Sequence, residues 1–200
     1  MKIGSRYKIA RRLGSHIFDK TSTVKYTQRA QQREGSKPRP KSDFGVQMLE
    51  KQKARFTYGV MERQFKKYVN EALAQKAEKA ESNLFTRLET RLDNVIYRLG
   101  LANSRAFARQ MVSHGHIILN GTRVTIPSIN VVVGDKIEVR AESLKRNLLK
   151  NMEGKLGEAK VPTWLTFDMS KKAGQVIALP TFNQTEVMFD MQAILEFYRR

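Results

Sequence analysis

The sequence contains no cysteine, which excludes disulfide bonds, thiolate ligands for zinc and cysteine nucleophiles. It has only three histidines, and two of them, His114 and His116, flank Gly115 in an expected turn. Two histidines that lie two residues apart can bind a metal, but here only distant acids accompany them. We therefore expect polar turn residues, with no metal site and no cofactor.

Long apolar runs are also missing: none approaches the about 20 residues that span a bilayer, and the first residues lack the apolar core of a signal peptide. We expect a soluble cytoplasmic chain without a membrane partner. Glycine-rich phosphate loops are absent. Carboxylates such as Glu62, Glu71 and Glu89 lie among Lys and Arg on expected helices, where they are ordinarily solvated partners and not acid–base pairs. We therefore expect no enzymatic activity.

Acidic residues are scarce: 19 Asp and Glu stand against 37 Lys and Arg, so the net charge is +18 and the pI is about 10.3. Such a balance points to a polyanionic partner. Residues 1–41 hold twelve basic and two acidic residues, whereas residues 161–200 hold four of each. A solvated, self-repelling tail is the alternative reading. We favour RNA contact, because so dense a charge attracts RNA in a cell.

We expect residues 1–41 to form a basic N-terminal extension that is mobile in the free protein, because its apolar residues are too few for a core. RNA phosphates would neutralise the charge and allow a short helix along a groove. The tail residues expected to contact RNA are Arg6, Lys8, Arg11 and Arg12. A turn-rich linker, residues 35–42, follows.

Residues 91–124, RLDNVIYRLGLANSRAFARQMVSHGHIILNGTRV, carry the most informative pattern. Thr90 and Asp93 have the spacing of a capping box, which predicts the start of a helix. Asn103 or Ser104 is expected to open a second helix. The apolar residues that recur at helical spacing are Leu92, Val95, Ile96 and Leu99 in the first segment and Phe107, Ala108, Met111 and Val112 in the second.

A polar face accompanies each apolar face. Arg105 and Arg109 lie four residues apart and project from one side of the second helix. Asn120-Gly121, between two short β-rich runs, predicts a two-residue hairpin turn. The residues of this module expected to bind RNA are Arg91, Asn94, Arg98, Ser104, Arg105, Arg109, Ser113, His114, Asn120, Gly121 and Arg123.

The runs R-L-D-x-x-x-x-R-x-G, S-R-x-x-A-R-Q-x-V and G-x-I-x-L-N-G in this stretch resemble the small RNA-binding domain named after the fourth protein of the small ribosomal subunit. That domain also occurs on tyrosyl-tRNA synthetases and pseudouridine synthases. The flanking segments distinguish between these proteins. Residues 42–65 and Pro162-Thr163-Trp164-Leu165 resemble segments of the bacterial-type small-subunit ribosomal proteins of this S-four family. Some relatives hold a cysteine-ligated zinc, a pattern from which this cysteine-free sequence departs.

The resemblance covers residues 42–170 and implies an α+β fold. A mainly helical, discontinuous domain comprises residues 42–90, completed by 156–200. Residues 91–155 form the inserted RNA-binding domain of two helices plus a small mixed sheet. Outside the module, periodicity predicts helices at 42–56, 60–82, 144–152 and 191–198 and strands at 131–133, 136–140, 164–169 and 175–179.

The family's role implies a structural constituent of the small ribosomal subunit that binds the 5′ domain of small-subunit (16S) rRNA. The family's role also implies that the protein nucleates assembly of the body of the small subunit and influences translational accuracy. Implied partners are the rRNA, neighbouring ribosomal proteins, notably the fifth, and mRNA at the entry channel. The alternatives are an RNA-modifying or tRNA-charging enzyme, for which the sequence leaves no room for a catalytic domain, and a ribosome-associated regulator.

Overall fold

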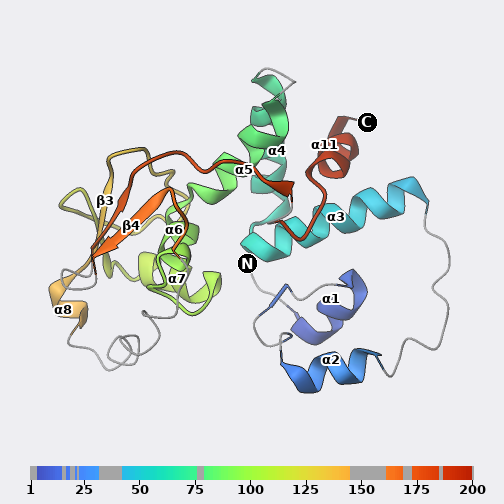
Figure 1. Ribbon diagram of the computed structural model, residues 1–200, viewed down its shortest axis with the longest axis horizontal. Helices are drawn as coiled ribbons and strands as arrows, with labels where there is room; N and C mark the ends of the chain where they lie inside the picture. Colours follow the sequence, from blue (N-terminus) through green and yellow to red (C-terminus); the bar gives the residue numbers. More distant parts are fainter. Residues whose placement is uncertain are drawn as a thin grey trace. The chain divides into compact units, whose positions relative to one another are not determined.

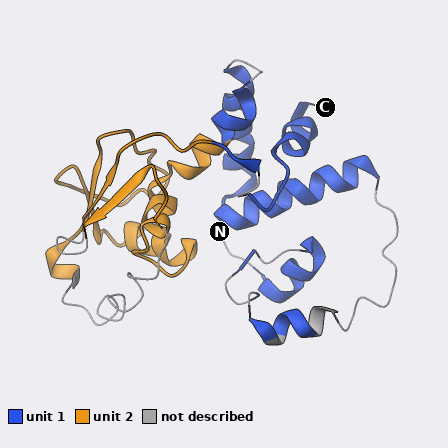
Figure 2. Cartoon of the chain, viewed as in Figure 1, with its two compact units in different colours: residues 1–84, 182–200 blue, residues 85–181 orange. Residues whose placement is uncertain are grey.

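The computed structural model describes residues 4–14, 17–18, 21, 23–31, 42–75, 79–144, 161–168, 173–184 and 187–199. The chain forms two compact units (Figure 2): a helical unit, Met1–Leu84 with Phe182–Arg200, and a sheet unit, Phe85–Thr181. Residues 35–41 of the expected linker (35–42) and residues 145–152 of an expected helix (144–152) lie outside the described residues.

The described elements of the helical unit are all α-helices (Figure 1). Its helices are α1 (Arg6–Leu13), α2 (Val24–Gln31), α3 (Asp43–Tyr58), α4 (Glu62–Ala74) and α11 (Met191–Arg199), and α5 (Ala80–Glu89) leads into the sheet unit. The Ser42 hydroxyl caps α3 as expected, accepting a hydrogen bond from the Gly45 amide at 3.3 Å. The prediction of a single helix over 60–82 is wrong. Helix α4 ends at Ala74, because Gln75 adopts an extended conformation with φ -84° and ψ 133°.

Helix α11 packs on α3 and α4 around fully buried side chains, among them Phe65, Met191 and Ile194. A polar contact reinforces this packing. The Glu62 carboxylate accepts hydrogen bonds from Lys51 Nζ and from the Tyr198 hydroxyl, both at 2.7 Å. The C-terminal helix is thereby joined to α3 and α4 by one carboxylate.

The N-terminal extension packs more than expected. Helix α1 buries Ala10 and Leu13 and contacts α3, and the ring of Phe18 lies 6.4 Å from that of Phe56. The expectation that its apolar residues are too few to pack is therefore wrong for the described part of the segment, because Ala10 and Leu13 suffice to seat α1 on α3. Its mobility in the free protein stays a prediction.

The sheet unit joins two helices to a five-stranded sheet. Its elements are α6 (Leu92–Arg98), α7 (Arg105–Ser113), β1 (Ile117–Leu119), β2 (Thr122–Val124), β3 (Lys136–Val139), α8 (Ala141–Leu144), β4 (Leu165–Asp168) and β5 (Ala173–Val176). The strand order is β2-β1-β3-β5-β4, and every pair is antiparallel. The expectation of a mixed sheet is therefore wrong, although the α+β class is confirmed.

Two further details differ from expectation. Residues 131–133 form no strand; Val132 and Val133 are exposed, and the neighbouring Asn130 makes only an isolated bridge to Arg91. Strands β4 and β5, which we placed with residues 156–200 in the helical domain, belong to the sheet unit: β5 pairs with β3, and β4 pairs with β5. Pairing between strands so distant in sequence leaves no local signature.

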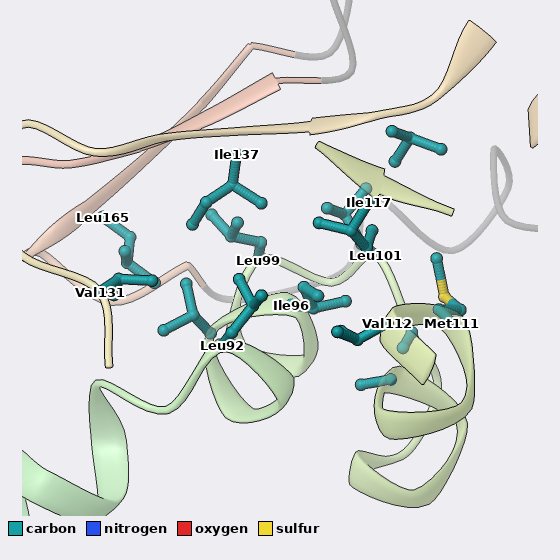
Figure 3. Close-up of a cluster of buried hydrophobic side chains, with 14 of the residues drawn as sticks. Leu92, Ile96, Leu99, Leu101, Met111, Val112, Ile117, Val131, Ile137 and Leu165 are labelled. Carbon is teal, nitrogen blue, oxygen red and sulfur yellow. The ribbon is translucent and has the colours of Figure 1, made fainter. Parts of the chain in front are cut away.

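Buried side chains from α6 and α7 meet those of the sheet in one core (Figure 3). Leu92 and Ile96 of α6, Leu99 at its C-cap and Ile137 of β3 are fully buried. Gly174 on β5 leaves room for Leu99: a Cβ atom at position 174 would lie 2.6 Å from Leu99 Cδ1. This core holds α6 and α7, the helices that carry the predicted RNA-binding residues Asn94, Arg98, Arg105, Arg109 and Ser113.

Candidate nucleic-acid interface

The start of α6 is set by a distant loop. The amide of Leu92 donates to the carbonyl oxygen of Ile129 at 2.8 Å, and the amide of Asp93 donates to that of Pro127 at 3.2 Å. The expected capping role of Thr90 is wrong, because its hydroxyl donates to the Thr86 carbonyl at 2.8 Å, in the helix before. Asp93 is consequently available for another partner.

That partner is a pair of arginines. Asp93, whose side chain is 1% exposed, accepts hydrogen bonds from Arg91 Nε and Nη2 at 3.1 and 2.8 Å. Its Oδ2 atom also accepts from Arg109 Nε and Nη2 at 2.8 and 2.7 Å. One buried carboxylate thus joins the start of α6 to the middle of α7.

Glu89, at the end of α5, forms a second cluster. Its carboxylate accepts from Arg98 Nε at 2.8 Å and Nη2 at 2.9 Å, the parallel geometry that suits a guanidinium and a carboxylate. The same carboxylate accepts from Asn94 Nδ2 at 3.0 Å, and Asn94 Oδ1 in turn accepts from Arg105 Nε at 2.7 Å. The Arg105 guanidinium also lies 4.4 Å from the centre of the Tyr97 ring.

These contacts revise the predicted site. Arg91 and Asn94 are 2% and 1% exposed, so they support the site from below and do not form its surface, contrary to expectation. Arg98, Arg105 and Arg109 are partly exposed, and we call these three residues the arginine row. Glu89 and Asp93 were not predicted as site residues, because the burial of a carboxylate on a helix depends on packing that helical spacing does not reveal.

The hairpin side of the module contains the other predicted residues. The Ser104 hydroxyl caps α7 by accepting from the Phe107 amide at 3.3 Å, a structural role for a residue expected to contact RNA. Ser113 and His114 are exposed at the end of α7. The guanidinium of the exposed Arg123 lies against the backbone of Gly115, where no side chain intervenes. Ser113, His114 and Arg123 therefore remain accessible to a ligand.

The Asn120-Gly121 turn forms as expected, with positive φ of 49° and 79°. Asn120 is exposed, but its side chain is engaged: Nδ2 donates to Asp135 at 2.7 Å, and Oδ1 accepts from the Lys136 amide at 2.9 Å. The turn is thus held to β3, which fixes its position in the sheet unit.

The four predicted tail residues lie on α1, away from its buried positions. Arg6, Lys8, Arg11 and Arg12 are all exposed there. They belong to the helical unit, whereas the arginine row belongs to the sheet unit. Each unit therefore presents its own set of exposed or partly exposed cations.

The arrangement suits the binding of a polyanion. Guanidinium groups hydrogen-bond phosphate oxygens in planar, charge-assisted pairs. Among the described residues, no group of three His, Cys, Asp or Glu side chains could hold a metal ion. The same part of the chain contains no helix long and apolar enough to cross a membrane.

Comparison with known proteins agrees with these features. Residues 1–89 match the ribosomal protein S4/S9 N-terminal domain, and residues 90–137 match the S4 domain. The small ribosomal subunit protein uS4 of Roseiflexus sp. (strain RS-1) is 44% identical over 198 residues, which cover 96% of each chain.

Relatives of lower identity carry the names uS4 and uS4B. The uS4 protein of Chlorobaculum tepidum is 37% identical over 201 residues, covering 98% of each chain. The uS4B protein of Clostridium acetobutylicum is 40% identical over 198 residues, covering 99% of this chain and 97% of the relative. These full-length matches confirm the resemblance found in the sequence. The chain belongs to the uS4 family of small ribosomal subunit proteins.

Proposed function

We propose that the chain binds the 5′ domain of small-subunit rRNA directly, with the arginine row paired to phosphates of helical RNA. As a uS4 family member it is a structural, non-enzymatic constituent of the small subunit, and its place of action is the cytoplasmic ribosome. The observation that carries the proposal is the arginine row itself: three arginines from α6 and α7, each fixed by a hydrogen bond within the sheet unit.

Recognition by shape follows from the geometry of RNA. The major groove of an A-form helix is too deep and narrow for side chains to read, so a fixed set of cations must match the positions of phosphates. Arg123 and the Ser113-His114 turn extend the contact along the sheet unit. In the helical unit, the cations of α1 supply a second contact that is less dependent on sequence.

Binding of this kind supports the finer roles implied by the family: early binding to the rRNA, nucleation of the body's assembly, and an influence on decoding accuracy. Contacts with the fifth small-subunit protein and with mRNA at the entry channel belong to the same proposal. The exposed apolar residues Val132, Val133 and Ile177 of the sheet unit and the exposed basic residues of α1 are surfaces that such partners could use.

A sedimentation experiment tests the proposal. Cell extract is centrifuged through a gradient at moderate salt, and the chain is quantified in each fraction. We expect one copy per small subunit, and we expect the purified protein to bind a transcript of the rRNA 5′ domain more tightly than a transcript of another rRNA domain of equal length. A chain found free or on stalled particles alone would favour a regulator, and equal affinity for both transcripts would refute the assignment to the 5′ domain.

A further inference from the structure

Two buried carboxylates lie directly beneath a surface that we assign to RNA. Glu89 and Asp93 are each 1% exposed, although a negative charge near phosphate is repulsive and burial of an ion costs several kcal/mol unless it is well paired. A protein that needed only positive charge would be better served by neutral residues at both positions. Their presence therefore requires an explanation in terms of what they hold.

What they hold is the orientation of the arginine row. Arg98, Arg105 and Arg109 each donate from Nε to an acceptor inside the sheet unit, at 2.8, 2.7 and 2.8 Å. A guanidinium held at Nε has its plane fixed. An unrestrained arginine loses rotamer entropy when it is immobilised, and a prearranged one loses less on binding.

Glu89 controls two members of the row. It binds Arg98 directly through both carboxylate oxygens. Asn94 Nδ2 also donates two hydrogen bonds to Glu89, one to the side-chain carboxylate and one to the backbone carbonyl oxygen, each at 3.0 Å. The amide nitrogen of Asn94 is thus turned toward Glu89, so that its oxygen faces Arg105. Asp93 holds the third member, Arg109, in the same way.

We propose that Glu89 and Asp93 are positioning residues for RNA, which raise affinity by holding Arg98, Arg105 and Arg109 in the arrangement that phosphates require. This inference rests on the proposed function, since the arginine row must contact RNA for its orientation to matter. Its consequence is opposite in sign to simple electrostatics: neutralising a buried acid increases the net positive charge and weakens RNA binding.

The test measures the affinity of the full chain for a transcript of the 5′ domain of small-subunit rRNA, at one salt concentration. Glu89→Gln preserves size and should lower affinity roughly five- to tenfold, a typical coupling between contacting groups. Glu138→Gln is the matched control, because Glu138 is exposed on β3 and its loss changes the charge equally. The control should bind as tightly as the parent or more tightly.

A double-variant background separates positioning from general stabilisation. With Arg98→Gln and Arg105→Gln in place, Glu89 has lost the two members of the row that it positions, so adding Glu89→Gln should leave affinity unchanged. Stability is read from a urea titration followed by the fluorescence of Trp164, the single tryptophan. An equal loss of affinity in both backgrounds would overturn the proposal, as would an unchanged or increased affinity of Glu89→Gln alone.

If Glu89→Gln does not fold, Asn94→Leu tests the proposal instead, because it removes the hydrogen bond to Arg105 and leaves the Glu89 carboxylate paired with Arg98. It should lower affinity about two- to threefold, and no further when Arg105→Gln is present; unchanged affinity would overturn the proposal. The two hypotheses fail differently. If the Arg98→Gln and Arg105→Gln variant binds like the parent, the proposed RNA contact is wrong; if it binds weakly while Glu89→Gln binds normally, only the positioning role is wrong.

Discussion

Replacing Gly174 with alanine should destabilise the sheet unit, because β5 and α6 approach each other too closely for a side chain. A Cβ atom at this position would lie 2.6 Å from Leu99 Cδ1 and 2.9 Å from Cδ2, and Leu99 is fully buried, so it cannot move into solvent. Overpacking of this kind costs about 1–3 kcal/mol. Alanine also lowers the conformational entropy of the unfolded chain, which stabilises the folded state by about 0.4–1 kcal/mol. The difference between the midpoints of these two ranges is a net loss of about 1.3 kcal/mol.

Urea titration followed by Trp164 fluorescence measures this loss, because Trp164 belongs to the core of the sheet unit. Gly4→Ala is the matched control, since no atom lies within 4 Å of an added Cβ there. Leu99→Ala removes the atoms that collide, so Gly174→Ala should cost less in that background than in the parent. A Gly174→Ala midpoint equal to or above that of the parent would refute the close packing of β5 on α6.

Two further changes test other parts of the fold. Gly121→Val should destabilise the sheet unit by about 1–3 kcal/mol through backbone strain alone, since φ is 79° and nothing lies within 4 Å of an added Cβ, whereas Gly121→Asn should cost less; equal urea midpoints for both would contradict the turn. Burial raises the pKa of Glu62, but hydrogen bonds from Lys51 and Tyr198 and the nearby charges outweigh it and hold that pKa below its ordinary value of 4.5. A lowered folded-state pKa stabilises the protein at pH values above the unfolded-state pKa, and this stability is lost as the pH falls through the folded-state pKa. Acid should therefore destabilise the parent protein more than Glu62→Gln in that pH range, as measured by helical circular dichroism. Identical acid-unfolding profiles would contradict the role of Glu62.

Local signals in the sequence predicted the local structure. The caps at Ser42 and Ser104 and the Asn120-Gly121 turn each depend on residues within three positions of one another, and all three form as expected. The alternation of Ile137 with its polar neighbours likewise predicted β3, whose burial alternates along the strand.

Contacts between distant residues were not predictable in this way. The amides at the start of α6 are satisfied by carbonyl groups of Pro127 and Ile129, so the capping-box spacing at Thr90 was misleading. The β-branched run at 131–133 resembles a strand but has only the isolated bridge of Asn130 beside it. Strand formation needs a partner as well as propensity, and the partner is set by the tertiary fold.

The same limit applied to the candidate site. Helical spacing correctly placed Arg105 and Arg109 on one side of α7, but it also assigned Arg91 and Asn94 to a polar surface. Both are buried, because the carboxylates of Asp93 and Glu89 satisfy them beneath the arginine row. A charged residue on a helix is ordinarily solvated, and only the packed structure shows the paired exceptions.

The salt dependence of rRNA binding tests the central claim most directly. Arg105→Gln with Arg109→Gln removes two guanidinium groups without placing a second carboxylate beside Asp93, and the control Arg63→Gln with Lys66→Gln removes two exposed charges from α4. Each lost phosphate contact lowers the slope of log affinity against log salt by roughly 0.7–0.9. We expect the arginine-row variant to lose about one to two units of slope, more than the control, while the fold is retained. An unchanged slope, or an equal loss in the control, would contradict RNA binding through the arginine row.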